Sequence, residues 1–257
     1  MTINANQTVK ELAVTLPGAT RVFEQLGIDY CCGGGRTLLD ACQSADLSFE
    51  EVTRSLVAAK SAEQTDRPWP NWQRESLAAL TVHIVVQHHA FTKQELERLE
   101  KLFEKVCSRH GERHPELFEA QQLFRRLKLD LVPHMLKEEQ VLFPYLTRLE
   151  VAVREDRAIP PPFFGTVRNP VRMMSTEHDL AGELLSGLRR VTGDFTPPAD
   201  GCISYQTLYQ ALSAFEADLH RHIHLENNIL FPRAIEMEDR AAPEFQQAGS
   251  EYHCHGH

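Results

Sequence analysis

The chain has 257 residues, of which 42% are hydrophobic, and a formal net charge of −9. This length is sufficient for a packed core and a second small domain, whereas the acidic balance argues against nucleic acid as a partner. No apolar run approaches the roughly 20 residues that span a bilayer, so we expect no membrane partner. The six cysteines show no disulfide-framework spacing and no secretory signal precedes them, which favours a cytoplasmic protein.

Residues 1–60 predict a small helical domain. The segments TVKE at 8–11 and SFEE at 48–51 both match the capping box that begins a helix. Between them, CCGGG at 31–35 predicts a flexible, exposed turn, because glycine gives the backbone unusual freedom. Residues 61–72 are polar and contain proline, which is typical of a linker.

Residues 73–240 predict an all-α, up-down-up-down four-helix bundle. Apolar residues recur at helical spacing over four segments, 73–109, 116–150, 171–191 and 204–238. The segments HMLKEEQVLFP at 134–144 and HIHLENNILFP at 222–232 share a His, a Glu four residues later and a final Leu-Phe-Pro. The repeat indicates two helical hairpins built in the same way. We expect the tail, 241–257, to be disordered.

Each predicted helix has one apolar face that is interrupted by histidine or glutamate. In the fourth helix this face runs through Leu208, Leu212, Phe215, Leu219, His222, Glu226 and Ile229, in steps of four and three. In the first helix it is predicted to run through Val82, Val85, His89, Thr92, Leu96 and Leu99. Together the four faces place four histidines and two glutamates inside the bundle, namely His89, His134, Glu138, His178, His222 and Glu226.

These six residues favour a metal centre. A buried glutamate costs several kcal/mol unless it is paired or coordinated, and no Lys or Arg lies on the four faces. The alternative is a bundle in which the histidines and glutamates only hydrogen-bond one another. Four imidazoles and two carboxylates inside a four-helix bundle favour a di-iron centre over structural zinc, which prefers closed sites rich in sulfur.

The other histidines are expected to lie outside this centre. His220 and His224 are predicted to share a polar, solvated face. His88 adjoins His89, and an error of one residue in helix phase would exchange the two. His110 and His114 are predicted to face solvent at a helix end. The last histidines, in HCHGH at 253–257, form a potential metal-binding tract in the tail.

The sequence resembles a known family, the iron–sulfur cluster repair di-iron proteins (RIC, repair of iron centres), which have a haemerythrin-like bundle. The motifs that carry the resemblance are DYCCGGGRTLLDAC at 29–42, HMLKEEQVLFP at 134–144, STEHDLAGELL at 175–185 and HIHLENNILFPRA at 222–234. The family's four histidines and two glutamates correspond to the six residues that periodicity selects. The resemblance implies two iron ions in a non-haem centre bridged by oxo and carboxylate groups.

The resemblance also implies a function. Such a protein helps to repair iron–sulfur clusters damaged by nitric oxide or oxidative stress by supplying iron, and its partners are the damaged proteins. One alternative is a protein that binds or reduces nitric oxide, and a less favoured one is an oxygen-binding haemerythrin, which typically uses five histidines. Enzymatic activity and a homodimer are left open.

The cysteines are assigned two kinds of role. Cys31 and Cys32 are predicted to help move iron or a nitrosyl ligand between the metal centre and a client, because thiolates are soft iron ligands. The alternative is a pair of ordinary loop cysteines. Cys42, Cys107 and Cys202 are predicted to be structural.

Overall fold

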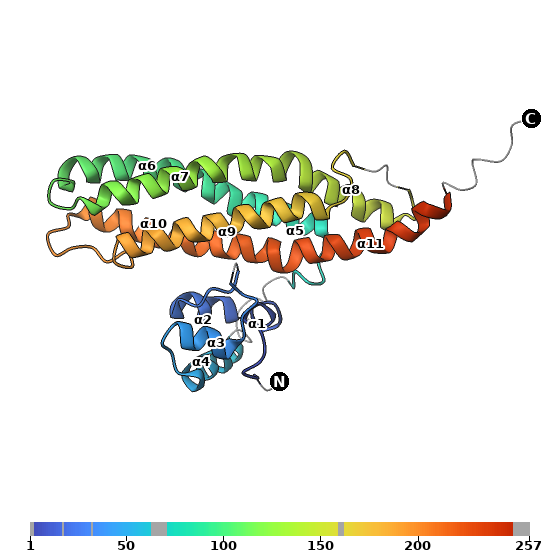
Figure 1. The fold of residues 1–257 in the computed structure, drawn as a ribbon, viewed down its shortest axis with the longest axis horizontal. Coiled ribbons are helices and arrows are strands. Elements are labelled where there is room, and N and C mark those ends of the chain that lie inside the picture. The colour runs from blue at the N-terminus through green and yellow to red at the C-terminus, as the bar shows by residue number, and fades with distance from the viewer. Residues whose placement is uncertain (1–2, 17, 32, 63–70, 159–161, 249–257) are drawn as a thin grey trace, which may run out of the picture.

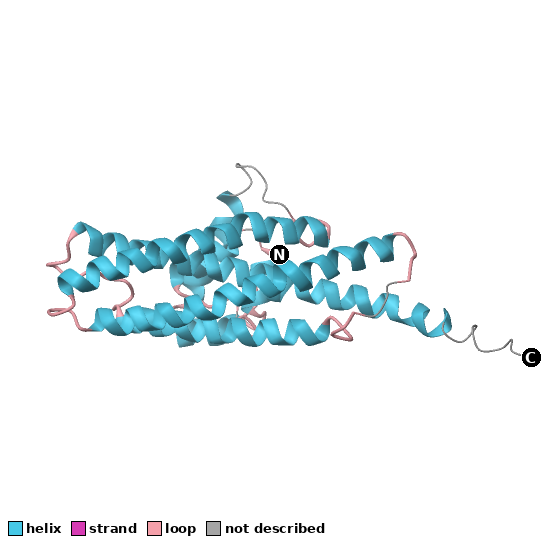
Figure 2. Ribbon diagram, turned by 90° about the horizontal axis from the view of Figure 1, so that it is seen from above, coloured by secondary structure: helices cyan, strands magenta, loops and turns pink. Residues whose placement is uncertain are grey.

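The computed structural model describes residues 3–16, 18–31, 33–62, 71–158 and 162–248. Within these ranges the regular structure is helical and contains no strand (Figure 2). The all-α prediction is therefore confirmed. Within the same ranges no helix has the length and apolar character needed to cross a membrane.

The N-terminal unit consists of four short helices around a core of its own. They are α1 (Val9–Thr15), α2 (Ala19–Leu26), α3 (Leu38–Ser44) and α4 (Phe49–Ala62). The predicted capping box begins α1, since the Glu11 N–H donates to Thr8 Oγ1 at 3.3 Å and the Thr8 N–H donates to the Glu11 carboxylate at 2.9 Å. Leu12, Phe23 and Leu56 are fully buried in this core.

Four long helices form the bundle, which is elongated (Figure 1). The first comprises α5 (Leu77–His83), η1 (Ile84–His89) and α6 (Ala90–His110), and the second comprises α7 (Glu116–Lys137), η2 (Glu138–Leu142) and α8 (Phe143–Arg154). The third is α9 (Arg168–Val191), and the fourth comprises α10 (Ile203–Leu225), η3 (Glu226–Leu230) and α11 (Phe231–Ala248). The last helix therefore extends past residue 240, where the tail was predicted to begin. The HCHGH tract lies outside the described residues.

Short π-helical turns interrupt three of these helices. Each π turn hydrogen-bonds from i to i+5, so it shifts the side chains that follow by about one residue around the helix. The first helix consequently buries Leu80 and Ile84 and then both His88 and His89, so that the candidate ligand His89 follows Ile84 by five positions. The prediction of an inward Val82 was wrong, since that side chain is 61% exposed. The face predicted for the fourth helix, from Leu208 to Ile229, is buried throughout.

The repeat in the sequence extends to a pair of helix caps. Glu150 and Glu238 lie twelve residues after Glu138 and Glu226. The Glu150 carboxylate accepts the N–H groups of Leu77 and Ala78 at 2.7 and 3.0 Å, which caps the start of α5. The Glu238 carboxylate accepts the Val167 N–H at 3.0 Å and caps the start of α9. In each hairpin, a glutamate near the end of the second helix therefore caps the N-terminus of the first helix.

The N-terminal unit lies beside the middle of the bundle, against α10 and η3 (Figure 1). Tyr30 is buried in this contact, where its carbonyl oxygen accepts a hydrogen bond from Asn228 Nδ2 at 3.0 Å. Two predictions fail because the N-terminal unit and the bundle cover each other's surfaces where they meet. His224 is only 5% exposed rather than solvated, and Cys31 is only 6% exposed rather than part of an open turn.

Candidate metal centre

The six residues predicted to face inward meet at one place in the bundle. His89 ends η1, Glu138 begins η2 and Glu226 begins η3, so the π turns lie at the positions of candidate ligands. His134 and His178 come from α7 and α9. Each of the six, including His222, exposes at most 2% of its surface. They form two groups of four that share both glutamates, and within each group the ligand atoms lie within 4.8 Å of one another.

Glu138 connects two histidines on different helices. Its Oε2 lies 3.4 Å from His89 Nε2, and its Oε1 lies 3.4 Å from His134 Nε2. The carboxylate therefore presents one oxygen to each group of four. This is the arrangement that a bridging carboxylate requires when it serves two neighbouring ions.

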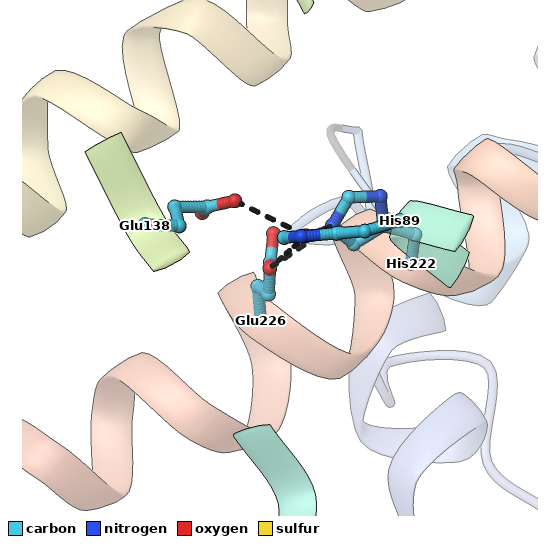
Figure 3. A group of neighbouring side chains, drawn as sticks. All are labelled: His89, Glu138, His222 and Glu226. Carbon is cyan, nitrogen blue, oxygen red and sulfur yellow. Dashed lines mark hydrogen bonds and ion pairs between the residues drawn. The ribbon is translucent and has the colours of Figure 1, made fainter. Parts of the chain in front are cut away.

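Glu226 has the same relationship to the other two histidines. Its Oε1 lies 3.0 Å from His222 Nε2, and its Oε2 lies 3.2 Å from His178 Nε2. Figure 3 shows the first group, in which the side chains of His89, His222 and both glutamates point toward one another. The two groups consequently share two carboxylates and differ only in their histidine pairs.

Three of the four histidines are held from behind through Nδ1. The pairs are His89 with Glu139 at 2.7 Å, His134 with Glu177 at 2.7 Å, and His178 with Asn227 Oδ1 at 3.0 Å. Acceptors at Nδ1 keep a ring proton there, so Nε2, which is directed into the centre, is the nitrogen that can give up its proton to a metal. This is the tautomer that a metal-binding imidazole uses.

The inner atoms have the contacts expected around cations. The Nε2 atoms of His134 and His178 lie 3.0 Å apart, so in the metal-free protein they can share a proton, and together they can bind one ion that replaces it. Both Glu138 oxygens and Oε2 of Glu226 are buried and lack a hydrogen-bond partner in the described structure. Buried polar atoms are normally satisfied. The nitrogen and carboxylate donors therefore fit iron.

The ionisation of the carboxylates suits metal binding. Burial raises the pKa of Glu138 and of Glu226, but the neighbouring imidazoles outweigh it and hold each pKa below its usual value. A hydrogen bond from His134, followed by one from Lys137, lowers the pKa of Glu177 to about 2. All three groups are consequently anionic near neutral pH, as ligands and their hydrogen-bonded supports must be.

The supporting residues Glu139, Glu177 and Asn227 were not predicted. Each directly precedes or follows a candidate ligand in the sequence, which turns it about 100° away from the inward face of an α-helix. Periodicity therefore assigns these residues to the surface. His88 and His89, which periodicity alone does not separate, have different partners: His89 belongs to the group of six, whereas His88 Nδ1 lies 3.1 Å from the Asp218 carboxylate and outside that group.

Cys31 lies at the contact between the two units and outside the group of six. Its Sγ donates to Asp29 Oδ1 at 3.3 Å, and the Gly33 N–H donates to Asp29 Oδ2 at 2.7 Å. A Cβ at Gly34 would lie 2.5 Å from the Tyr30 carbonyl oxygen, so this loop needs glycine there. Cys31 also lines a cleft of about 700 Å³ with Asp29 and His220. Cys32 lies outside the described residues.

Comparisons with known proteins agree with this geometry. Residues 80–234 match the Hemerythrin HHE cation binding domain, and residues 5–60 match a domain of unknown function, DUF542. A probable iron-sulfur cluster repair protein of Haemophilus influenzae is 36% identical over 233 residues, which cover 90% of this chain and 97% of that protein. The chain belongs to the family of iron–sulfur cluster repair proteins.

Other members of this repair family align over a similar length. The iron-sulfur cluster repair protein YtfE of Dickeya chrysanthemi is 34% identical over 91% of this chain and 98% of its own length. The protein of the same name from Yersinia pestis is 33% identical over the same shares. The cation-binding family model covers the bundle with its His and Glu groups, so the bundle of this repair protein holds a metal site.

Proposed function

We propose that this chain holds two iron ions and supplies iron for the repair of iron–sulfur clusters damaged by nitric oxide or oxidative stress. The observation that carries the proposal is that two groups of four donors share both carboxylates. The names of the relatives support the repair role. Damaged iron–sulfur proteins are the proposed partners, and the cytoplasm is the proposed location.

The residues divide between two proposed ion positions. His89 and His222 would hold one ion, His134 and His178 the other, and Glu138 and Glu226 would bridge them. When bound, the iron would supply exchangeable, redox-active ions with coordination positions open to a small ligand such as nitric oxide or oxygen. The chain itself excludes water through its buried side chains and holds the imidazoles in one orientation from behind.

The chemistry of the donors supports release of iron to a client. Imidazole and carboxylate ligands are harder than the thiolates of an apo-cluster, which are the preferred ligands of cluster iron. Iron would therefore move toward the thiolates once a path exists. Cys31 and Cys32 are proposed to assist this movement, and the place of Cys31 in the cleft between the two units supports that role.

Iron content and iron transfer test the proposal together. We expect the purified chain to contain two irons, and to restore the visible spectrum of an apo-ferredoxin supplied with sulfide. A Cys31→Ala/Cys32→Ala double variant should keep its iron and transfer it more slowly. If the native chain binds two irons but does not transfer them, while nitric oxide changes its visible spectrum, nitric oxide binding replaces iron donation as the function.

A further inference from the structure

A second group of reactive side chains lies at the far end of the bundle, in the contact between the end of α6 and the start of α10. His110 is the last residue of α6 and Cys202 immediately precedes α10. His110 follows His89 by 21 residues of continuous helix, which is about 30 Å along the axis. This pair is therefore separate from the metal centre.

The two side chains are in direct contact. Cys202 Sγ lies 3.1 Å from His110 Nε2, which is hydrogen-bonding distance for a thiol and an imidazole. Both residues are half-buried rather than enclosed, so the thiol is open to a small reagent. His110 Nδ1 is buried and has no hydrogen-bond partner in the described structure, which leaves Nε2 as the nitrogen engaged in the contact.

The surrounding groups favour the thiolate form of Cys202. The backbone amide of Tyr205, followed by the amide and hydroxyl of Ser204, lowers the thiol pKa, and the positive charge of Arg109 acts in the same direction. A thiol at the start of a helix also faces the positive end of the helix dipole. The carboxylates of Asp200 and Glu116 are both engaged by His114, at Nε2 (3.0 Å) and at Nδ1 (3.1 Å) respectively.

Other cysteines have the opposite environment. Cys42 and Cys107 are buried, and burial raises the pKa of both thiols. Cys107 Sγ lies 3.7 Å from the Leu117 carbonyl oxygen, an acceptor that stabilises the thiol and not the thiolate. The structural role predicted for these two cysteines is consistent with such surroundings, whereas Cys202 combines an open position with groups that stabilise negative charge.

We propose that Cys202, assisted by His110, is a thiol–disulfide exchange site for small anionic disulfides. The Cys202 proton passes to His110 Nε2, and the thiolate attacks one sulfur of the disulfide. A new S–S bond forms as the old one breaks, and the departing thiolate takes the proton from His110. The protein thiol is thereby oxidised to a mixed disulfide, and the other half of the reagent is reduced to a thiol. Arg109 favours reagents that carry carboxylates.

Oxidised glutathione is a suitable probe for the reduced, full-length, metal-loaded protein. The rate of mixed-disulfide formation at each cysteine is measured by peptide mass spectrometry from pH 5 to pH 9. We expect Cys202 to react at least about tenfold faster than Cys107 at pH 7. The midpoint of its pH–rate curve should lie below the ordinary thiol pKa of about 8.5. The iron content should not change, because the site is remote from the metal centre.

The variant His110→Asn tests the pair. We expect loss of the imidazole to raise the thiol pKa by about one unit, which removes about nine-tenths of the thiolate at pH 7. The remaining thiolate is about threefold more nucleophilic. The rate at pH 7 should therefore fall roughly threefold, and the midpoint of the pH–rate curve should move to higher pH. Ser108→Ala is the matched control, because Ser108 is exposed on the same helix and its hydroxyl donates to the Lys105 carbonyl oxygen rather than to the thiol, so it should leave the rate unchanged. Circular dichroism establishes that both variants are folded.

The wild-type measurement decides the proposal even if His110→Asn fails to fold. A Cys202 that reacts no faster than Cys107, or whose midpoint lies at or above 8.5, overturns it. Equal rates in folded wild-type protein and folded His110→Asn overturn the role of the histidine.

Discussion

The ring of Tyr30 stands edge-on against the ring of His224, with 5.3 Å between their centroids. This contact joins the N-terminal unit to the helical segment that also carries His222 and Glu226. The Tyr30 hydroxyl donates to Glu24 at 2.7 Å, so the ring is held from both sides of the contact. Adjacent turns of one helix therefore carry both the docking contact of the N-terminal unit and two residues of the metal centre.

Tyr30→Ala should detach the N-terminal unit from the bundle. Removing a large buried aromatic side chain typically costs about 3–5 kcal/mol, because it leaves a cavity. We expect Cys31, now 6% exposed, to become reactive toward iodoacetamide. The bundle should keep its iron, since none of the six candidate ligands belongs to that unit.

Tyr30→Phe is the matched control for this variant. It keeps the ring and loses only the hydrogen bond to Glu24, which contributes about 1 kcal/mol. Cys31 should therefore stay protected in this variant. Equal labelling of Cys31 in both variants would show that the hydroxyl, and not ring packing, maintains the contact.

Glu138→Leu should abolish stable iron binding and stabilise the metal-free bundle. The Glu138 carboxylate is fully buried, and in the metal-free protein the neighbouring imidazoles must compensate its charge. Replacing a buried charged group by an apolar side chain often stabilises a protein by about 1–4 kcal/mol. Removing iron from the wild-type chain with a chelator should lower its melting temperature, whereas the variant should melt above the metal-free wild type.

Elemental analysis and thermal circular dichroism on the same samples check this prediction. Gln140→Leu serves as the control, because that side chain is exposed two residues further along and should leave the iron content unchanged. Two irons per chain in Glu138→Leu would contradict the proposed ligand set.

Glu177→Ala should weaken iron binding without unfolding the bundle. The carboxylate holds His134 Nδ1 at 2.7 Å, and loss of such a supporting group typically costs about 10–100-fold in metal affinity. Glu177→Gln keeps an acceptor and should recover part of the affinity. Competition with a chelator of known affinity measures both, with the exposed Glu183→Gln on the same helix as the control.

Glu150→Ala should destabilise the bundle by about 1–2 kcal/mol, because the first N–H groups of α5 lose their acceptor. Glu238→Ala should cost more, since Glu238 also accepts a hydrogen bond from Tyr145 at 2.5 Å. Chemical denaturation of the iron-free protein measures both. Glu236→Ala, which removes only an exposed ion pair with Arg240, should change stability by less than about 0.5 kcal/mol.

The sequence by itself determined the bundle and the inward position of the four histidines and two glutamates at its centre. A helix buries one face, and that face is visible as apolar residues at steps of three and four. His222 and Glu226 interrupt such a face where leucine would be expected, so the interior was the only place for them. The spacing alone also indicated that Glu138 and Glu226 have equivalent positions in two similar hairpins.

Only the tertiary structure decided the helix phase before His89. The π turn at Ile84–His89 adds a residue that a regular period does not anticipate, and it turns Val82 outward. The tertiary structure also decided the burial of His224, which depends on Tyr30 from the N-terminal unit. Glu150 and Leu77 are likewise separated by 73 residues. A local pattern reports which way a side chain points on its own helix, whereas partners and solvent access depend on segments that only folding brings together.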